Sequence, residues 1–578
     1  MATSFKWVPQ LEIHELAKTQ DVESVCKLIE NGISIDARDE NDLTPLAHAS
    51  KSRVADVSMV RFLVESGADV NALVDGERMQ PLVLAACSGD QEKVQFLADA
   101  GANIDFVSSK GYAVLVHVMY KLFDDAQLVP MTQLLTRLGA DVDCETNYEE
   151  SPLSVASQFG RFDAVNVLLD AGADPSPLRW TTLMRAVALG TTDDLEQVLK
   201  VDESQIHKRD RWERTAWLLA CVTGDIDKGK RILAAGADLD DRQKMGADAL
   251  GICAARGHTK MLRWILDRGA EIDAVDDTGQ TALMMAVQSG NTDCVRVLLE
   301  SGANSKQSHR NKHSLMSMAS SEEVMRLLID AGHSITEINP IMKRRLLGLD
   351  GERVLRVSVS EYQYGCEPRY GKANPEVMNI PFWNEMVRTG IFAHRAKKQF
   401  RDVADISQPT WCHSRYGVSL NELPDGRLVQ IGGEHEDYYD PDFCIYNDVL
   451  VHEKGGRFEI MGYPKNVFPP TDFHTATYFD GHIYIIGGLG YQGTRQFGMT
   501  PVYRLDCRSW KIESFASTGD NPGWIYKHVA LMEEEGILMV SAGKVCVEVD
   551  GREKHEDNTD RFAFDLQIGV WTRITNQP

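Results

Sequence analysis

The five residues Gly67-Ala68-Asp69-Val70-Asn71 return in varied form along the first half of this chain. A glycine–alanine pair followed by an acidic residue or asparagine recurs at Gly101, Gly139, Gly172, Gly236, Gly269 and Gly302. The steps between successive glycines are 34, 38, 33, 64, 33 and 33 residues, and the step of 64 corresponds to two periods. A period near 33 residues is typical of stacked helical repeats. We therefore expect a surface built by repetition rather than a single pocket.

Residues 279–303 show the repeat unit most clearly. Thr281 can cap a first helix, because its hydroxyl can accept a hydrogen bond from an unpaired amide of the first turn. Apolar residues follow at helical spacing until Gly290 interrupts them. A second helix is expected to end at Gly302, since a left-handed backbone at a helix end favours glycine.

A second signal recurs where the first helices begin. Its best copy is Thr44-Pro45-Leu46-Ala47-His48-Ala49. Weaker copies begin at Gln80, Ser151, Thr181, Thr215 and Thr281. The pattern resembles the ankyrin repeat, and the resemblance covers residues 9–336 as about ten repeats. It departs from a regular array at residues 111–138, which are lengthened, and at residues 183–213, which lack the glycine–alanine turn. Residues 1–340 are thus predicted to form an all-α ankyrin solenoid.

The ankyrin resemblance implies protein binding through the inner helices and the tips of the hairpins between repeats. The tip residues predicted to contact a partner are Asp75, Tyr148, Lys208, Arg242 and Asp276. Loops are polar in most proteins, so the alternative is that each of these is a solvated loop residue.

Charge and composition restrict the partner and the compartment. The net charge is −24, with −18 in residues 1–340 and −6 in residues 341–578. Nucleic acid and anionic membranes require a cationic surface, so neither is expected as a partner. A basic protein surface would fit, although solubility alone also explains the charge. No apolar signal core or membrane-length apolar run is present, and the 11 cysteines form no Cys-x-x-Cys pair. A cytoplasmic location is expected.

Residues 341–410 are predicted to be a connector. Residues 353–360 alternate partially between apolar and polar side chains, which favours a strand. Residues 381–388 begin with proline and favour a helix, whose apolar stripe around Trp383 and Met386 is expected to be buried.

A different period begins after residue 410. Three apolar runs end in glycine, at Ile431-Gly432-Gly433, Ile486-Gly487-Gly488 and Ala542-Gly543. Their last glycines are 55 residues apart, and Trp510 and Trp571 close two of the three copies. Four short strands, a double glycine and a late tryptophan in each copy resemble the kelch repeat, which forms one blade of a β-propeller. Residues 411–578 are therefore predicted to be all-β, with three kelch-like propeller blades.

Three blades pose a physical problem. Propellers close with about four to eight blades, and an open ring leaves exposed strand edges. One hypothesis is that two chains form a homodimer with a six-bladed ring. The other is that residues 351–410 supply further strands and close the ring within one chain.

The most unusual string lies in the loop expected after Gly433. Residues 434–442 contain five acidic residues and a histidine. The predicted contacts with a basic partner are Glu434, Glu436, Asp437, Tyr438 and Tyr439. Oxygen ligation of a hard cation and a solvated loop with packed tyrosines are the alternatives. Further partner candidates, from equivalent loops and turns, are Tyr491, Arg495 and Trp524.

Cysteine and histidine side chains in this half raise the question of a metal. Cys412, His413, His435 and His474 would suit zinc or copper if the strands brought them together, but their spacing does not require it. His474 and His528 occupy the same position in successive blades, which favours a structural hydrogen bond. No cofactor is therefore expected.

The chain lacks a phosphate-binding Gly-x-x-x-x-Gly-Lys loop, a Gly-x-Ser-x-Gly elbow and a His-Glu-x-x-His motif. The predicted function is a non-catalytic protein-binding or scaffold protein with two recognition surfaces. One alternative is a galactose-oxidase-like enzyme, since some kelch-fold proteins hold copper and oxidise sugars. The other is an adaptor for protein degradation, as kelch and ankyrin proteins can be.

Overall fold

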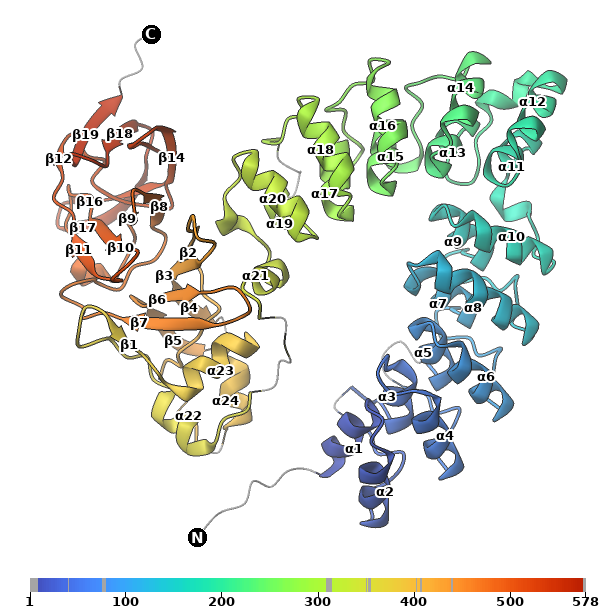
Figure 1. The fold of residues 1–578 in the computed structure, drawn as a ribbon, viewed down its shortest axis with the longest axis horizontal. Helices are drawn as coiled ribbons and strands as arrows, with labels where there is room; N and C mark the ends of the chain where they lie inside the picture. The colour runs from blue at the N-terminus through green and yellow to red at the C-terminus, as the bar shows by residue number, and fades with distance from the viewer. Residues whose placement is uncertain are drawn as a thin grey trace. The chain divides into compact units, whose positions relative to one another are not determined.

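The computed structural model describes residues 9–39, 41–74, 79–307, 314–349, 351, 355–401, 403–405, 408–437 and 440–574. The chain forms two compact units, Met1–Asn304 and Ser305–Pro578, and each is described by itself. The first unit is helical, whereas the second combines helices with β-sheets (Figure 1).

The first unit consists of consecutive helix pairs. The first helices of the pairs are α1 (Pro9–Ala17), α3 (Pro45–Lys51), α5 (Pro81–Ser88), α7 (Val114–Lys121), α9 (Pro152–Gln158), α11 (Thr182–Ala188), α13 (Ala216–Thr223), α15 (Ala249–Arg256) and α17 (Ala282–Ser289). The second helices are α2 (Val22–Glu30), α4 (Val57–Glu65), α6 (Gln91–Asp99), α8 (Asp125–Arg137), α10 (Phe162–Asp170), α12 (Thr192–Val201), α14 (Ile226–Ala234), α16 (Thr259–Leu266) and α18 (Thr292–Glu300). The predicted helical solenoid is confirmed.

The recurring motifs begin and end these helices as expected. The hydroxyl of Thr281 accepts a hydrogen bond from the Met284 amide at 3.3 Å and caps α17. Gly302 follows α18 with a φ of 88°, a left-handed conformation that side chains with a Cβ rarely adopt. The chain can therefore turn sharply out of each helix pair into the next hairpin.

The last polar residue of the Gly-Ala-Asp-x-Asp motif joins one repeat to the next. The side-chain oxygen of this last residue accepts a hydrogen bond from a backbone amide in the next copy of the motif. The donor is the third residue of that next copy, which is aspartate or asparagine. The pairs are Asp36–Asp69, Asn71–Asn103, Asp143–Asp174 and Asp273–Asn304. The motif thus forms a turn and also hydrogen-bonds neighbouring repeats to each other.

Buried cations make a second connection between repeats. Lys93 on α6 donates hydrogen bonds to the carbonyls of Ala49 and Ser52, at 3.1 and 2.6 Å, where α3 ends. Lys228 on α14 reaches the end of α11 in the same way. The last carbonyls of a helix carry partial negative charge and lack partners within the helix, so a cation there stabilises the junction.

The regular stacking is interrupted between α10 and α11. A short 3-10 helix, η1 (Ser176–Leu178), packs against α9, while α11 packs against α13. Arg214, ion-paired with Asp210, donates to the carbonyl and the hydroxyl of Ser157 at 2.9 Å each. Arg256 reaches the carbonyl of Gln158 at 3.0 Å. Two arginines therefore join repeats that are not neighbours in sequence.

We expect Arg214→Met to lower the free energy of unfolding of the first unit by about 3–5 kcal/mol. The reason is that Asp210, whose side chain is fully buried, would lose its cation. Arg185→Met, at an exposed position of α11, is the control and should change the free energy of unfolding by no more than about 0.5 kcal/mol. Denaturant unfolding measures both variants, and equal effects would contradict this role of Arg214.

The second unit begins with helices. Their bounds are α19 (Leu315–Met318), α20 (Glu322–Asp330), α21 (Pro340–Leu346), α22 (Val359–Gly365), α23 (Pro381–Thr389) and α24 (Ala393–Gln399). The pair α19 and α20 brings the helix pairs among the described residues to ten, in line with about ten repeats. This last pair belongs to the second compact unit, whereas the predicted domain limits of 340 and 410 remain predictions.

The strand predicted for residues 353–360 is wrong for the part of it that the structure describes. No strand is formed from 355 to 360, and α22 begins at Val359. The Ser358 hydroxyl accepts from the Glu361 amide at 3.2 Å, and the Glu361 carboxylate accepts from the Ser358 amide at 2.8 Å. This reciprocal cap starts a helix and outweighs the partial apolar alternation.

The helix predicted from Pro381 is confirmed as α23. Trp383 and Met386 are fully buried, and the Trp383 ring stacks on Trp411 at 4.7 Å between centroids. The same apolar cluster contains Leu428 and Leu450 from the first β-sheet. The stripe therefore forms core against the sheet.

Three antiparallel sheets follow. The first has the order β1 (Glu376–Val377), β7 (Phe458–Gly462), β6 (Val449–His452), β3 (Leu428–Ile431) and β2 (Ser419–Glu422). The second has the order β11 (Ile512–Ser514), β10 (Val502–Asp506), β9 (His482–Ile486) and β8 (Thr475–Phe479). The third has β12 (Thr518–Gly519), which pairs in parallel, then β19 (Val570–Ile574), β18 (Arg561–Asp565), β15 (Ile537–Ser541) and β14 (Val529–Glu534). Each contains the predicted four-stranded meander.

Two smaller sheets complete the part of the chain that is described. One has the order β13 (Trp524–Tyr526), β16 (Lys544–Val549) and β17 (Arg552–Asp557), and the other pairs β4 (Glu434–Asp437) with β5 (Asp440–Ile445). The predicted β-rich region is confirmed, but the described strands do not close into a ring.

The first two large sheets make the same contact with the segment that follows each of them. The Gly433 amide donates to the Thr471 carbonyl at 2.8 Å, and the Gly488 amide donates to the Ile525 carbonyl at 2.9 Å. A Cβ on Gly432 would overlap the carbonyl oxygen of Thr471, so the close approach there requires glycine. The double glycines of the first two copies therefore bind their sheets to the segments that follow, at Thr471 and at β13.

The hypothesis that residues 351–410 close the ring is not supported by the described part of that segment. Its one described strand is β1, a two-residue strand at the edge of the first sheet, and the remainder contains α22 to α24. This segment as a whole contributes more than half of the buried residues in the apolar cluster on the first sheet, and seven of them lie in the three helices. The connector therefore packs on the first sheet and does not add a further sheet to the series.

Candidate functional site

The structure places the predicted hairpin residues of the first unit differently from one another. Tyr148 is 61% exposed in the turn between α8 and α9, and Lys208 is also exposed. Asp276 accepts hydrogen bonds from the amides of Thr278 and Gln280 at 2.8 Å each, so it shapes its own turn. Asp75 lies outside the described residues.

Arg242 has a structural role that the sequence analysis missed. Its guanidinium donates to the carbonyl of Gly246 in its own hairpin, at 3.1 Å, and to that of Val275 in the next hairpin, at 2.7 Å. Arg38 and Arg209 make equivalent pairs of bonds. The recurrence identifies a backbone bridge between hairpins, and contact with a partner remains a prediction for Arg242.

Apolar residues at the hairpins, with the exception of Tyr148, were also missed by the sequence analysis. Among the described residues of the first unit, eight large apolar side chains are exposed, and five of them lie in hairpins between repeats. These five are Leu73, Val107, Tyr148, Met245 and Val275. An apolar residue in an otherwise polar turn was the signal that could have found them. Exposed apolar side chains in a row are typical of a protein-binding surface.

In the second unit, the acidic segment forms a hairpin and not the loop that was expected. Glu434 pairs with Ile445 across β4 and β5, and Asp437 pairs with Asp440. The positions of Glu436 and Asp437 are therefore on a strand. Tyr438 and Tyr439 lie outside the described residues, so contact of this segment with a partner stays a prediction.

Three predicted partner residues come together around the loop that follows Gly488. The side chains of Arg495 and Trp524 both donate to the carbonyl of Leu489, at 2.9 and 3.1 Å. The hydroxyl of Tyr491 accepts from the Ile445 amide at 2.9 Å. The loop is thus fixed to both the β4–β5 hairpin and the β13–β16–β17 sheet.

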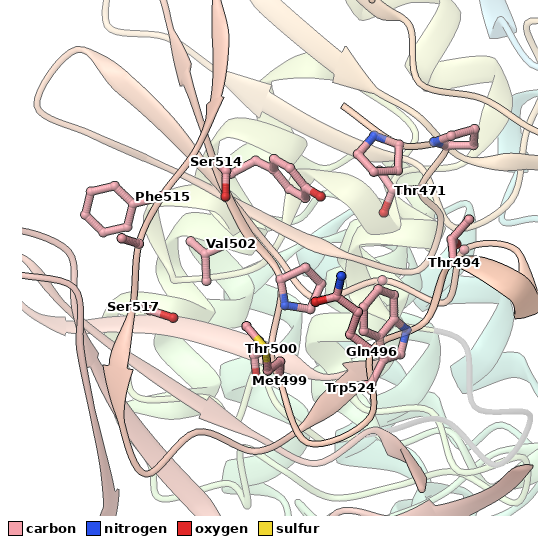
Figure 2. Close-up of a pocket in the computed structure, with 18 residues that line it drawn as sticks. Thr471, Thr494, Gln496, Met499, Thr500, Val502, Ser514, Phe515, Ser517 and Trp524 are labelled. Atoms are coloured by element: carbon pink, nitrogen blue, oxygen red, sulfur yellow. The ribbon is translucent and has the colours of Figure 1, made fainter. Parts of the chain in front are cut away.

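Trp524 also forms part of the wall of a cavity of about 440 Å³ (Figure 2). Met499, Val502 and Phe515 contribute apolar surface, and the hydroxyl of Thr471 lies at the edge. The volume lies within the range of about 300–1,000 Å³ for small-ligand sites. None of the described residues that line it is charged, so the cavity suits an apolar ligand better than acid–base chemistry.

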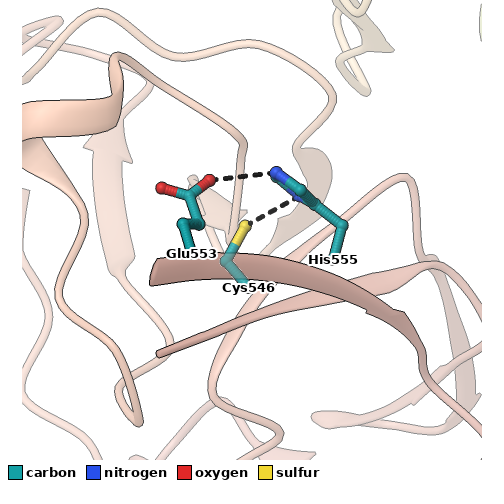
Figure 3. A group of neighbouring side chains, drawn as sticks. All are labelled: Cys546, Glu553 and His555. Carbon is teal, nitrogen blue, oxygen red and sulfur yellow. Dashed lines mark hydrogen bonds and ion pairs between the residues drawn. The ribbon is translucent and has the colours of Figure 1, made fainter. Parts of the chain in front are cut away.

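The four residues considered as metal ligands do not converge among the described side chains. Cys412, His413, His435 and His474 are buried, but no three of them have ligand atoms within 4.8 Å of one another. His435 is hydrogen-bonded to the Ser414 carbonyl at 3.2 Å instead. One group in the described part of the chain does meet that distance: Cys546, Glu553 and His555 (Figure 3).

The structural hydrogen bond predicted for His474 and His528 is confirmed. Ser419 at the start of β2 is joined to His474 at 2.8 Å, and Thr475 at the start of β8 is joined to His528 at 2.8 Å. Burial lowers the pKa of His474 from 6.5 to about 4 and that of His528 to about 3. Both rings are therefore neutral at physiological pH.

We expect acid to weaken the joints between the sheets. Unfolded histidines bind a proton near pH 6.5, whereas His474 and His528 do so only near their folded pKa values of about 4 and about 3. The unfolded state then binds more protons, so stability falls as the pH decreases from 6.5 through this range. Thermal unfolding of the full chain at several pH values should show a smaller loss of stability on acidification for His474→Gln than for the wild type. His482→Gln, at a partly exposed position, is the control and should follow the wild type; an unchanged profile for His474→Gln would refute the linkage.

Comparisons with known proteins agree with the helical repeats. Residues 13–108 match the family model described as Ankyrin repeats (3 copies), and residues 252–299 match Ankyrin repeats (many copies). The chain therefore contains ankyrin repeats, and these support a protein-interaction role.

The curated relatives share only a part of the chain. The Drosophila melanogaster "Transient receptor potential cation channel subfamily A member 1" is 32% identical over 148 residues, which is 25% of this chain and 12% of that protein. The Caenorhabditis elegans "Ankyrin repeat and KH domain-containing protein mask-1" is 28% identical over 184 residues, or 32% and 7% of the two chains. "Dauer abnormal formation protein 25" from the same organism is 28% identical over 109 residues, or 19% and 28%. The chain spans well under two thirds of the length of each of these relatives.

Within the described part of this chain, no helix is long and apolar enough to span a bilayer.

Proposed function

We propose that this protein is a non-catalytic scaffold that binds a protein partner on its ankyrin solenoid. The observation that carries the proposal is the row of exposed apolar residues at the hairpins, from Leu73 to Val275. Polar groups of the same hairpins are bonded within their own turn, as Asp276 is, or to the next hairpin, as Arg242 is. The turns are thereby held rigid while their apolar side chains face solvent, which lowers the ordering cost of binding.

The charge of the solenoid favours a basic partner. Residues 1–340 carry −18 of the net charge of −24. A negative surface accelerates the encounter with a basic protein and disfavours acidic ones. Apolar hairpin residues would then supply the affinity and the surrounding charge the selectivity.

For the β-rich half, the proposed architecture is kelch-like and serves as the second recognition surface. Three successive meanders, each with glycine after its second strand, and the repeated joints at Gly433 and Gly488 support this. A ring completed by a homodimer remains a hypothesis. Light scattering tests it, because a chain that stays monomeric at all concentrations excludes it.

The hairpin residues are tested by removing apolar area without adding charge. After a partner has been identified by capture with the full chain, Tyr148→Ser and Met245→Ser should each weaken binding by about 10- to 30-fold, as loss of an interface hot spot does. Titration calorimetry measures this change. Val201→Ser is the matched control, because Val201 is 87% exposed but lies at the end of α12. Unchanged binding of both hairpin variants, or an equal loss with Val201→Ser, would argue against this surface.

A further inference from the structure

The β16–β17 hairpin places three metal-binding side chains on one face. Cys546 lies directly opposite His555 in the strand register, and Glu553 lies two residues before His555. Because side chains alternate along a strand, all three share one face of the sheet. The Cys546 Sγ and His555 Nδ1 are 3.4 Å apart, and the His555 Nε2 and Glu553 Oε1 are 3.0 Å apart (Figure 3).

Two of the three side chains are buried, and one carboxylate oxygen among them has no partner. Cys546 is fully buried, and the Glu553 side chain is only 8% exposed. The Glu553 Oε1 is paired with Arg495, whereas its Oε2 is buried and has no hydrogen-bond partner. An unpaired buried carboxylate oxygen is costly, and a bound cation would remove that cost.

We propose that Cys546, Glu553 and His555 bind a zinc ion. One thiolate, one imidazole and one carboxylate are the ligand types that Zn²⁺ takes in proteins. Ligand atoms on one tetrahedral zinc are roughly 3.3–3.8 Å apart, given bond lengths of about 2.0–2.3 Å. The ligand atoms here lie within 4.8 Å of one another, so small side-chain rotations bring them into place. The His555 side chain is 40% exposed, which leaves the fourth position open to water or a ligand.

Arg495 completes the site from outside. Its guanidinium is held by the carbonyls of Leu489 and Gly490 at 2.9 Å each, and it pairs with Glu553 on the oxygen that the metal would not need. A ligating carboxylate in proteins is itself usually hydrogen-bonded in this way. Arg495 is therefore a positioning residue for Glu553.

Zinc is bound by the thiolate form of cysteine, so binding at Cys546 releases a proton. Zinc forms the Zn–S bond as the S–H proton leaves to solvent, and the sulfur is neither oxidised nor reduced. The affinity for zinc should accordingly rise with pH, from about 6 to about 8.

The test uses the full chain after removal of metals with a chelator. Titration with Zn²⁺ in competition with a chromophoric chelator should give one equivalent bound. Titration with Co²⁺ should give a thiolate-to-cobalt charge-transfer band, which reports sulfur ligation directly. Cys546→Ser should abolish the band, and His555→Gln should lower the zinc affinity by at least about 100-fold. His555 is partly exposed, so its variant is expected to fold even where Cys546→Ser does not.

Cys507→Ser is the matched control, because Cys507 is a buried thiol elsewhere in the second unit. It should retain both the band and the affinity. Binding of less than one equivalent of zinc by the folded wild type would overturn the proposal. A charge-transfer band that persists in Cys546→Ser, or zinc affinity unchanged in His555→Gln, would overturn it as well.

Discussion

The structure depends on bonds between successive repeats, because no single repeat can satisfy its own polar ends. A helix leaves its last carbonyls unpaired, and a cation from the next repeat pairs with them, as Lys93 does at the end of α3. In the β-rich half, the Gly433 amide likewise finds its acceptor outside its own sheet, at the carbonyl of Thr471 just before β8. In both halves of the chain, therefore, hydrogen bonds between successive repeats pair backbone groups that a single repeat leaves unpaired.

These bonds decide which residues remain available for function. Polar residues that appear to be ligand contacts in a sequence are often occupied, as Arg242 is by the backbone of the next hairpin. Apolar side chains at the same hairpins face solvent in the described part of the chain, and those of Tyr148 and Met245 are more than half exposed. Burial of exposed apolar side chains contributes more binding free energy than exposed ion pairs do. A partner that covers these apolar side chains would therefore bind more strongly than one that contacts only the charged groups.

Periodicity was enough to predict the helix pairs, their caps and the three meanders, because each is determined by residues close together in sequence. Thr281 and Gly302 act as their sequence context indicates. The error at residues 355–360 arose because a local cap, Ser358 with Glu361, was overlooked. Sites were harder to predict, because Cys546 and His555 become neighbours only through the register of β16 and β17. Adjacency in sequence suggested the residues around 412 and 435, which the described structure holds in separate contacts.

The loop at Leu489 connects the proposed zinc ligands with the cavity. Its carbonyl accepts hydrogen bonds from both Arg495, which holds Glu553, and Trp524, which forms part of the cavity wall. A ligand in the cavity that moved Trp524 would therefore disturb the same carbonyl that positions Arg495. Coupling between binding sites is reciprocal, so an ion held by Glu553 would in turn change the shape available to that ligand. One backbone carbonyl thus gives the chain a physical means to make the occupancy of one site depend on the other.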